Sequence, residues 1–185
     1  SIAFSPDGRR VVFNSRPGDF IQDISELCPT RDSHLIMVDV DTGEVLWQAT
    51  EPTGFVRKPV FTGDGSRVLT NNRRCDSFIT VWDAATGEKI GEWEGHQSHI
   101  WDISASPDGK WIATGSHDMT AILWDAATGA IAYTLVHDTP VISVAFSPDS
   151  TKLLTVTLSG NFHLWDTASG QEIQRLSGHI SVARG

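Results

Sequence analysis

A Trp-Asp dipeptide that recurs through the chain constrains its fold more than any other feature. Trp82-Asp83, Trp124-Asp125 and Trp165-Asp166 are three copies, and Val38-Asp39 is a degenerate fourth. The interval between copies is about 40 residues, and a fixed period of that size indicates small units that bury their faces only by stacking on one another. The chain is therefore expected to be a run of similar units.

Two further markers run in phase with the dipeptide. The first is a tight turn with Pro at an early position and Gly near its end, as in Ser106-Pro107-Asp108-Gly109; Pro presets φ and Gly supplies a positive φ. The second is Gly95-His96 and Gly178-His179, with Val136-His137 halfway between. Short apolar or alternating runs rich in β-branched residues separate the markers, and they predict about four strands per unit. In the third unit these are Ile100–Ala105, Trp111–Gly115, Ala121–Trp124 and Ala130–Val136.

Gly-His, Ser-Pro-Asp-Gly and Trp-Asp, in this order and period, resemble the WD-repeat (tryptophan-aspartate repeat) β-propeller family along the whole chain. The resemblance implies an all-β fold of WD-type four-stranded antiparallel blades, about four of them, within a single segment spanning 1–185. The expected blades cover about 1–50, 51–94, 95–136 and 137–177, and 178–185 would begin the next.

Two arrangements of these blades remain open. The favoured one is a fragment of a larger ring, which in this family usually has about seven blades. The alternative is a four-bladed ring closed by its own ends, since Gly178–Gly185 and Ser1–Phe4 are complementary in phase. The ends would accordingly pair with missing blades or with each other.

The resemblance also implies a buried chain of hydrogen bonds linking Asp, His, Ser or Thr, and Trp within a blade. An indole N–H needs an acceptor, and a hydroxyl accepts and donates in series. In the third blade the chain would use Asp118, His96, Trp124 and either Thr114 or Ser116. In the fourth blade, where Ser159 replaces the Asp, the expected members are His137, Trp165 and either Thr155 or Thr157. In the second blade they are Asp76 and Trp82.

A catalytic interpretation would make Ser116 a nucleophile beside this His and Asp. No G-x-S-x-G elbow supports it, and recurrence of the same residue types at the same phase favours a structural role. We therefore expect no catalytic residues and no enzyme activity. The seven His lack the close paired spacing of a zinc site, so neither metal nor cofactor is expected.

The resemblance implies that partners dock on one face of the propeller. This face carries the loops that join strand two to strand three of each blade and the loops that join one blade to the next. The first repeat inserts about fifteen residues there, within 16–33, and loops of that length are usually functional or disordered. Aromatic and Arg side chains are typical of interaction hot spots. The candidate partner-binding residues are Phe55, Arg57, Arg73, Arg74, His99, Trp101, His117, Pro140, Ile142 and Leu158.

Composition narrows the function. A formal net charge of -9 disfavours a nucleic-acid partner, and no apolar run is long enough for a membrane helix. The chain has two cysteines, Cys28 and Cys75, and so few indicate a reducing compartment. We therefore expect a cytoplasmic protein, with the periplasm or the nucleus as alternatives. Whether Cys28 and Cys75 form a disulfide is left open. The leading hypothesis is a non-catalytic scaffold or adaptor that binds a protein or peptide. The alternatives are a regulatory propeller of a larger kinase- or peptidase-linked enzyme and a carbohydrate-binding, lectin-like propeller.

Overall fold

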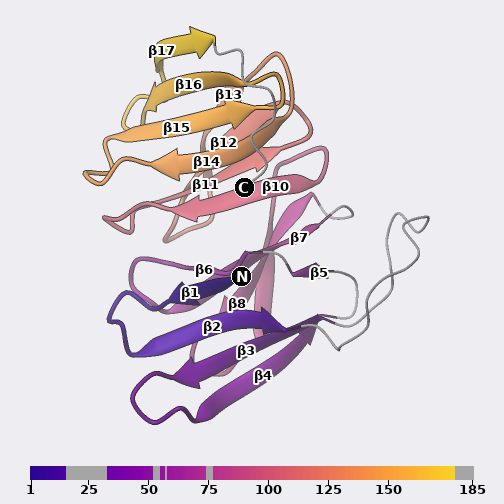
Figure 1. Ribbon diagram of the computed structural model, residues 1–185, viewed down its shortest axis with the longest axis vertical. Coiled ribbons are helices and arrows are strands. Elements are labelled where there is room, and N and C mark those ends of the chain that lie inside the picture. Colours follow the sequence, from indigo (N-terminus) through magenta and orange to yellow (C-terminus); the bar gives the residue numbers. More distant parts are fainter. Residues whose placement is uncertain (16–32, 52–54, 57, 74–76, 178–185) are drawn as a thin grey trace, which may run out of the picture.

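The computed structural model describes residues 1–15, 33–51, 55–56, 58–73 and 77–177. Every regular element in this part of the chain is a β-strand, and the strands form four antiparallel sheets in chain order (Figure 1). The first sheet contains β1 (Ile2–Phe4), β2 (Arg10–Ser15), β3 (Ser33–Asp39) and β4 (Val45–Glu51). The second contains β5 (Phe55–Val56), β6 (Val60–Phe61), β7 (Arg67–Arg73), β8 (Phe78–Asp83) and β9 (Lys89–Glu94).

The third and fourth sheets have the same topology. The third contains β10 (Ile100–Ala105), β11 (Trp111–Ser116), β12 (Thr120–Asp125) and β13 (Ile131–Val136). The fourth contains β14 (Val141–Phe146), β15 (Lys152–Thr157), β16 (Asn161–Asp166) and β17 (Glu172–Ser177). In the second sheet β5 and β6 both pair with β7, and Pro59, which has no N–H to give to a ladder, lies between them. The predicted all-β fold of four-stranded antiparallel blades is confirmed.

The Asp of each repeat dipeptide shapes the turn between the third and fourth strands. In the third sheet, Oδ1 of Asp125 accepts hydrogen bonds from the backbone N and the hydroxyl of Thr128, at 2.8 and 2.7 Å. Gly129 then adopts φ +75°, a conformation that residues with a Cβ rarely adopt. These local interactions reverse the chain after each Trp-Asp pair, which explains the spacing of the motif.

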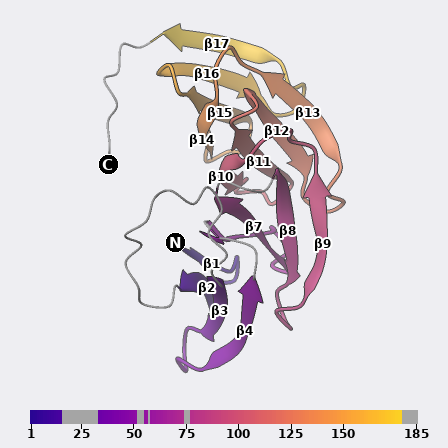
Figure 2. The ribbon, with the colours of Figure 1, turned by 90° about the vertical axis from the view of Figure 1, so that its right-hand side faces the viewer.

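The sheets stack face to face along an open arc (Figure 2). Three apolar cores lie between successive sheets: one joins Met37 to Trp82, the next joins Leu69 to Ile112, and the third joins Leu123 to Leu153. Each sheet thus buries its apolar faces against its neighbours in the sequence, as expected for units too small to have a core of their own.

Aromatic residues on the fourth strands strengthen these contacts at one edge of the arc. Trp47 packs on Gly87 of the second sheet, Trp93 on Gly129 of the third, and Tyr133 on Gly170 of the fourth. A Cβ placed on any of these glycines would lie 2.4 to 2.6 Å from the ring. Nε1 of Trp47 also donates to the Ala84 carbonyl at 3.1 Å, and the Tyr133 hydroxyl donates to that of Ala168 at 2.6 Å. The glycine is therefore needed for its φ and for the space it leaves.

Candidate functional site

The third sheet holds an uninterrupted chain of side-chain hydrogen bonds. Nε1 of Trp124 donates to Oγ1 of Thr114 at 2.8 Å, and Thr114 Oγ1 lies 2.8 Å from Nε2 of His96. Nδ1 of His96 is 2.8 Å from Oδ2 of Asp118. Because a carboxylate only accepts, Nδ1 carries the imidazole proton and Nε2 accepts from the threonine hydroxyl. Each group in this buried chain therefore donates to the next, from the indole to the carboxylate.

Asp118 ends this chain and also fixes a turn. It accepts hydrogen bonds from the Gln97 backbone N at 2.8 Å and from the Thr120 hydroxyl at 2.6 Å. Burial by itself would raise the pKa of the Asp118 carboxyl, but the hydrogen bonds from His96, Thr120 and Gln97 outweigh it and hold that pKa well below its usual range. The carboxylate is thus charged at neutral pH and ties the β11–β12 turn to the segment before β10.

Ser116 does not belong to the path from Trp124 to Asp118. Its hydroxyl donates to the carbonyls of Ser98 and His99 at 3.0 Å and accepts from the backbone N of Asp118 at 3.1 Å. Of the two hydroxyls left open by the sequence, Thr114 therefore bonds His96, and Ser116 bonds the backbone. The catalytic interpretation needs a serine hydroxyl bonded to His96, whereas His96 bonds Thr114.

The fourth sheet has a shorter version of this chain. Trp165 donates to Thr155 at 3.0 Å, and Thr155 lies 2.7 Å from Nε2 of His137. Nδ1 of His137 is 3.0 Å from the Leu135 carbonyl, which takes the place of a carboxylate. In the second sheet, Trp82 donates to Thr70 at 2.9 Å, and Asp76 lies outside the described residues.

His163 belongs to this polar group, although no repeat marker includes it. It is buried, its Nδ1 lies 2.8 Å from a carboxylate oxygen of Glu172, and its ring packs edge-on against His137 with centroids 4.7 Å apart. Burial, and next to it the charge that His163 can carry, lower the pKa of His137 to about 4.

The low pKa of His137 predicts a pH dependence of stability. His137 must be neutral in the folded chain, whereas an unfolded histidine takes up a proton near pH 6.5. This stability is present in full above pH 6.5 and is lost as the pH falls from 6.5 toward 4. We expect a loss of roughly 3 kcal/mol in the free energy of unfolding over that window. Urea titrations at a series of pH values measure it.

His137→Asn should flatten this slope, although it also lowers stability at every pH. His34→Asn is the matched control, because His34 is a half-buried strand residue and should leave the slope unchanged. A slope between pH 6.5 and 4 that is the same in wild type and His137→Asn would show that His137 is not the group that titrates.

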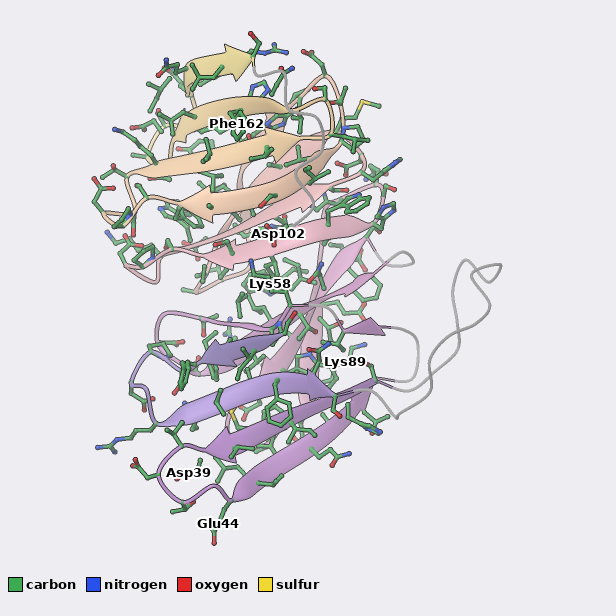
Figure 3. The ribbon with its side chains drawn as sticks, in the orientation of Figure 1. Asp39, Glu44, Lys58, Lys89, Asp102 and Phe162 are labelled. Carbon is green, nitrogen blue, oxygen red and sulfur yellow. The ribbon has the colours of Figure 1, made fainter. Side chains whose placement is uncertain are left out.

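Asp102 links three sheets. Its Oδ1 lies 3.0 Å from Nζ of Lys58, before β6, and its Oδ2 accepts from the hydroxyl of Ser143 at 2.9 Å and the backbone N of Val144 at 3.1 Å, both on β14. Lys58 and Asp102 point toward each other across the gap between the second and third sheets (Figure 3). No repeat marker includes Asp102, so the sequence analysis missed it.

The β11–β12 and β15–β16 turns and the connections between successive sheets form one edge of the arc, here called the loop edge. The candidate partner residues of the third and fourth sheets lie at this edge. The His99 ring stacks on His117 with centroids 4.8 Å apart and lies 5.5 Å from the Trp101 ring. His117 is exposed, whereas His99 and Trp101 are half-buried. An aromatic cluster thus lies at the loop edge of the third sheet.

The fourth sheet repeats this geometry with aliphatic residues. The backbone N of His117 donates to the His99 carbonyl, and that of Leu158 donates to the Pro140 carbonyl, at 3.1 and 2.8 Å. Leu158 is exposed, while Pro140 and Ile142 are half-buried. In the second sheet the backbones of Phe55 and Arg73 pair across β5 and β7. Arg57, Arg74, Cys28, Cys75 and the insertion at 16–32 lie outside the described residues.

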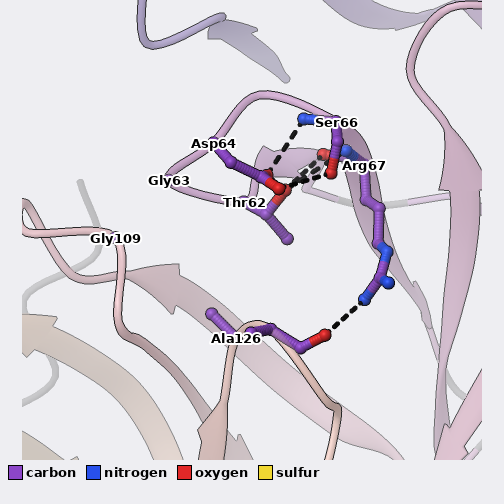
Figure 4. A pocket seen from close by; sticks show the side chains of 8 residues that line it. Thr62, Gly63, Asp64, Ser66, Arg67, Gly109 and Ala126 are labelled. Atoms are coloured by element: carbon purple, nitrogen blue, oxygen red, sulfur yellow. Dashed lines mark hydrogen bonds between the residues drawn. The ribbon is translucent and has the colours of Figure 1, made fainter.

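A small hollow lies at the opposite edge, where the turn before β7 meets the turn after β12. It holds about 160 Å³ (Figure 4). Arg67 reaches across it to donate to the Ala127 carbonyl at 2.9 Å. Hydrogen bonds from Thr62, and next from Ser66, lower the pKa of Asp64 to about 2. The polar side chains of this hollow are thus engaged with their own turn or the next sheet. The lining residues are Thr62, Gly63, Asp64, Ser66, Arg67, Gly109, Ala126 and Ala127.

The described residues give no sign of a metal-binding group or of a membrane-spanning helix. They contain no group of three or more His, Cys, Asp or Glu side chains arranged to hold a metal ion. Among the same residues, no helix has the length and apolar character to cross a membrane.

Four-stranded sheets stacked along an arc, with a Trp–Thr–His chain inside the third and fourth, define a repeat protein of the β-propeller class. The family model described as "WD domain, G-beta repeat" matches residues 87–125 and 129–166 of this chain. A chain in the crystal structure of a mitotic checkpoint complex has the same fold, with a TM-score of 0.74 at 19% identity over 96% of this chain and 50% of that one.

Curated relatives include two proteins named eukaryotic translation initiation factor 3 subunit I. The one from Meyerozyma guilliermondii is 46% identical over 82 residues, which is 44% of this chain and 24% of that protein. The one from Pyricularia oryzae is 41% identical over 104 residues, or 56% of this chain and 30% of that protein. The matches therefore span about a quarter to a third of the relatives' length.

Proposed function

We propose that this chain is a non-catalytic scaffold that binds a protein or peptide at its loop edge. The observation that carries the proposal is the cluster of His99, Trp101 and His117. In it the His99 ring stacks on His117 and lies tilted against Trp101, and none of the three residues is part of the three cores between the sheets. Aromatic side chains supply much of the binding energy at protein interfaces, because they bury a large area with few rotatable bonds.

The relatives support this proposal. They are named as one subunit of a translation initiation factor, and a subunit works by contact with other proteins. The proposed setting is the cytoplasm, where translation begins. The net charge of -9 agrees with a protein partner rather than the nucleic-acid backbone. Within the proposed surface, Leu158, Pro140 and Ile142 extend the cluster onto the fourth sheet. Phe55, Arg57, Arg73 and Arg74 remain candidate partner residues by their place in the sequence.

Trp101→Ala tests this function. Immobilised wild-type and variant chains are incubated with a cytoplasmic yeast extract, and the retained proteins are quantified by mass spectrometry. We expect a loss of about tenfold or more in the proteins that the wild type retains, because truncating a central aromatic removes a hot spot. Ile173→Ala, an exposed apolar residue on β17 away from the loop edge, is the matched control and should retain them.

Thermal unfolding of each variant separates lost binding from lost folding. The proposal fails if folded Trp101→Ala and Ile173→Ala chains retain the same proteins in the same amounts as the wild type.

A further inference from the structure

The fourth strand of each sheet lies at the outer rim of the arc (Figure 2). These four strands, β4, β9, β13 and β17, are called the rim strands here. Each pairs with the third strand of its own sheet on one side, and no described strand pairs with its other side. The outward backbone groups of such an edge can accept a further strand, and proteins commonly guard the edge with charged side chains. The rim strands differ in this protection.

Backbone register aligns the rim strands residue by residue. Ile131 of β13 pairs with Trp124, and its equivalents pair with the matching residue of the dipeptide in their own sheets: Val45, Lys89 and Glu172. Three positions later, the equivalents of Thr134 are Gln48, Glu92 and Arg175. β9 therefore has three charged side chains and β17 has two, while β4 ends in Glu51. β13, with the sequence Ile-Ala-Tyr-Thr-Leu-Val, has none.

A hydrogen bond at the end of β13 fixes the direction of its amide groups. The backbone N of His137 donates to the carbonyl of Met119, the residue before β12, at 2.9 Å. Because amide groups alternate in direction along a strand, the N–H groups of Val136, Thr134 and Ala132 point away from β12. The outer edge of β13 thus presents backbone donors at every second residue, among side chains that carry no charge.

Packing of the other side chains holds this edge in place. Tyr133 rests on Gly170 of the fourth sheet, and Leu135 belongs to the core that the third and fourth sheets share. An added strand would therefore meet a preformed edge, which lowers the entropic cost of binding. The side chains at the two ends of the strand remain accessible, since Val136 is 72% exposed and Ile131 is 45% exposed. The third sheet also packs on a described sheet at each of its faces.

A second copy of this chain is a poor occupant of this edge. β13 has six residues and is therefore about 20 Å long. Two copies that meet along their rims would share a strip of roughly 20 Å by 10 Å, or about 400 Å² of buried surface in total, whereas a stable interface buries about 1,200 Å² or more. Each copy also has a net charge of -9, which opposes association. An extended segment of a different protein avoids this repulsion when it is basic.

We propose that β13 binds an extended segment of a partner protein, which adds a fifth strand antiparallel to β13 at the rim of the third sheet. The segment has uncharged β-branched or aromatic side chains beside Ile131, Thr134 and Val136, because such cross-strand pairs stabilise neighbouring strands. It carries Lys or Arg at its ends, which complement the acidic chain. The rim is a different surface from the loop edge, so this inference does not depend on the function proposed above.

A synthetic peptide with the sequence KTVTVTVK tests the proposal in an NMR titration of the isotope-labelled 185-residue chain. The peptide is N-methylated along one edge, so that it cannot stack on itself and pairs only through its other edge. We expect saturable shifts centred on the amides of Ala132, Thr134 and Val136. The same peptide N-methylated along both edges is the control: it keeps the side chains and the charge, and it should give no such shifts.

Thr134→Lys locates the contact. It places a charge in the middle of β13, where β17 has Arg175, and it should weaken binding of the peptide about tenfold or more. Gln48→Lys makes the same change at the equivalent position of β4 and should leave the affinity unchanged. Both residues are exposed, and thermal unfolding checks that both variants are folded.

The proposal is overturned by a peptide that gives no saturable shifts, by shifts centred on another rim strand, or by equal affinities of the wild type and Thr134→Lys. Sedimentation velocity of the chain alone tests the other occupant. A wild-type dimer that Thr134→Lys dissociates would make a second copy, and not a partner segment, the strand that pairs with β13.

Discussion

His96→Ala is expected to lower the free energy of unfolding by about 3 kcal/mol, because it leaves two buried partners without their hydrogen bonds. Thr114 and Asp118 each bond a different nitrogen of this ring. Removal of the ring leaves the Thr114 hydroxyl without its acceptor and deprives the carboxylate of its strongest donor. Urea unfolding followed by tryptophan fluorescence measures the change.

His34→Ala is the control for this prediction. His34 lies half-buried on β3, and among the described residues its side chain bonds the Thr50 hydroxyl, at 3.2 Å, so its loss should cost less than about 1 kcal/mol. If the two variants lose the same free energy, the chain of hydrogen bonds in the third sheet does not stabilise the fold as described here.

Gly129→Ala is expected to cost about 3 kcal/mol, from backbone strain and from the displacement of a packed ring. At φ +75° any side chain is strained, and the new Cβ would lie 2.4 Å from Nε1 of Trp93. The variant should therefore loosen the contact between the second and third sheets. Chemical unfolding of Gly129→Ala and Gly43→Ala compares the cost of backbone strain with the cost of displacing the ring.

Gly43→Ala separates strain from packing. Gly43 has nearly the same φ, +74°, and a Cβ there meets no described atom within 4 Å, so the substitution should cost only about 1 kcal/mol. Equal losses at Gly129 and Gly43 would mean that the ring of Trp93 does not rest on the glycine of the next sheet.

The sequence predicts well what happens inside a repeat. The spacing of the Trp-Asp pairs and turns placed the strands of the third sheet within about two residues of their observed ends, because alternation and turn chemistry are local. The link between Trp124 and His96 was left open between two hydroxyls. Thr114 and Ser116 lie two residues apart on the same face of β11 and both are fully buried, so strand alternation does not distinguish them. Their positions along the strand relative to His96 and Trp124 decide which hydroxyl makes the link.

Contacts between repeats were harder to predict. Asp102 reaches Lys58 in one direction and Ser143 in the other, and no marker within a single repeat identifies it. No repeat marker includes the aromatic residues of the fourth strands. Their partners are glycines one repeat later, so their role appears when successive sheets are compared.

The repeat pattern fails to identify His163 for a third reason. It occupies a position in β16 where β12 has Ile122, so neither the period nor the motif marks it. Its importance comes from what surrounds it: His137, Trp165 and Glu172 converge on it from three strands or loops. Such convergence depends on the packed fold and not on spacing in the sequence.

Nuclear Overhauser effects from three aromatic side chains test the central claim most directly, that each repeat is one sheet stacked on the next. The account predicts that the rings of Trp47, Trp93 and Tyr133 give cross-peaks to the α protons of Gly87, Gly129 and Gly170, each in the following sheet. Ring-current shifts of those α protons should accompany the cross-peaks. Cross-peaks that join these rings to glycines of their own repeat, or to a sheet other than the next, would contradict it.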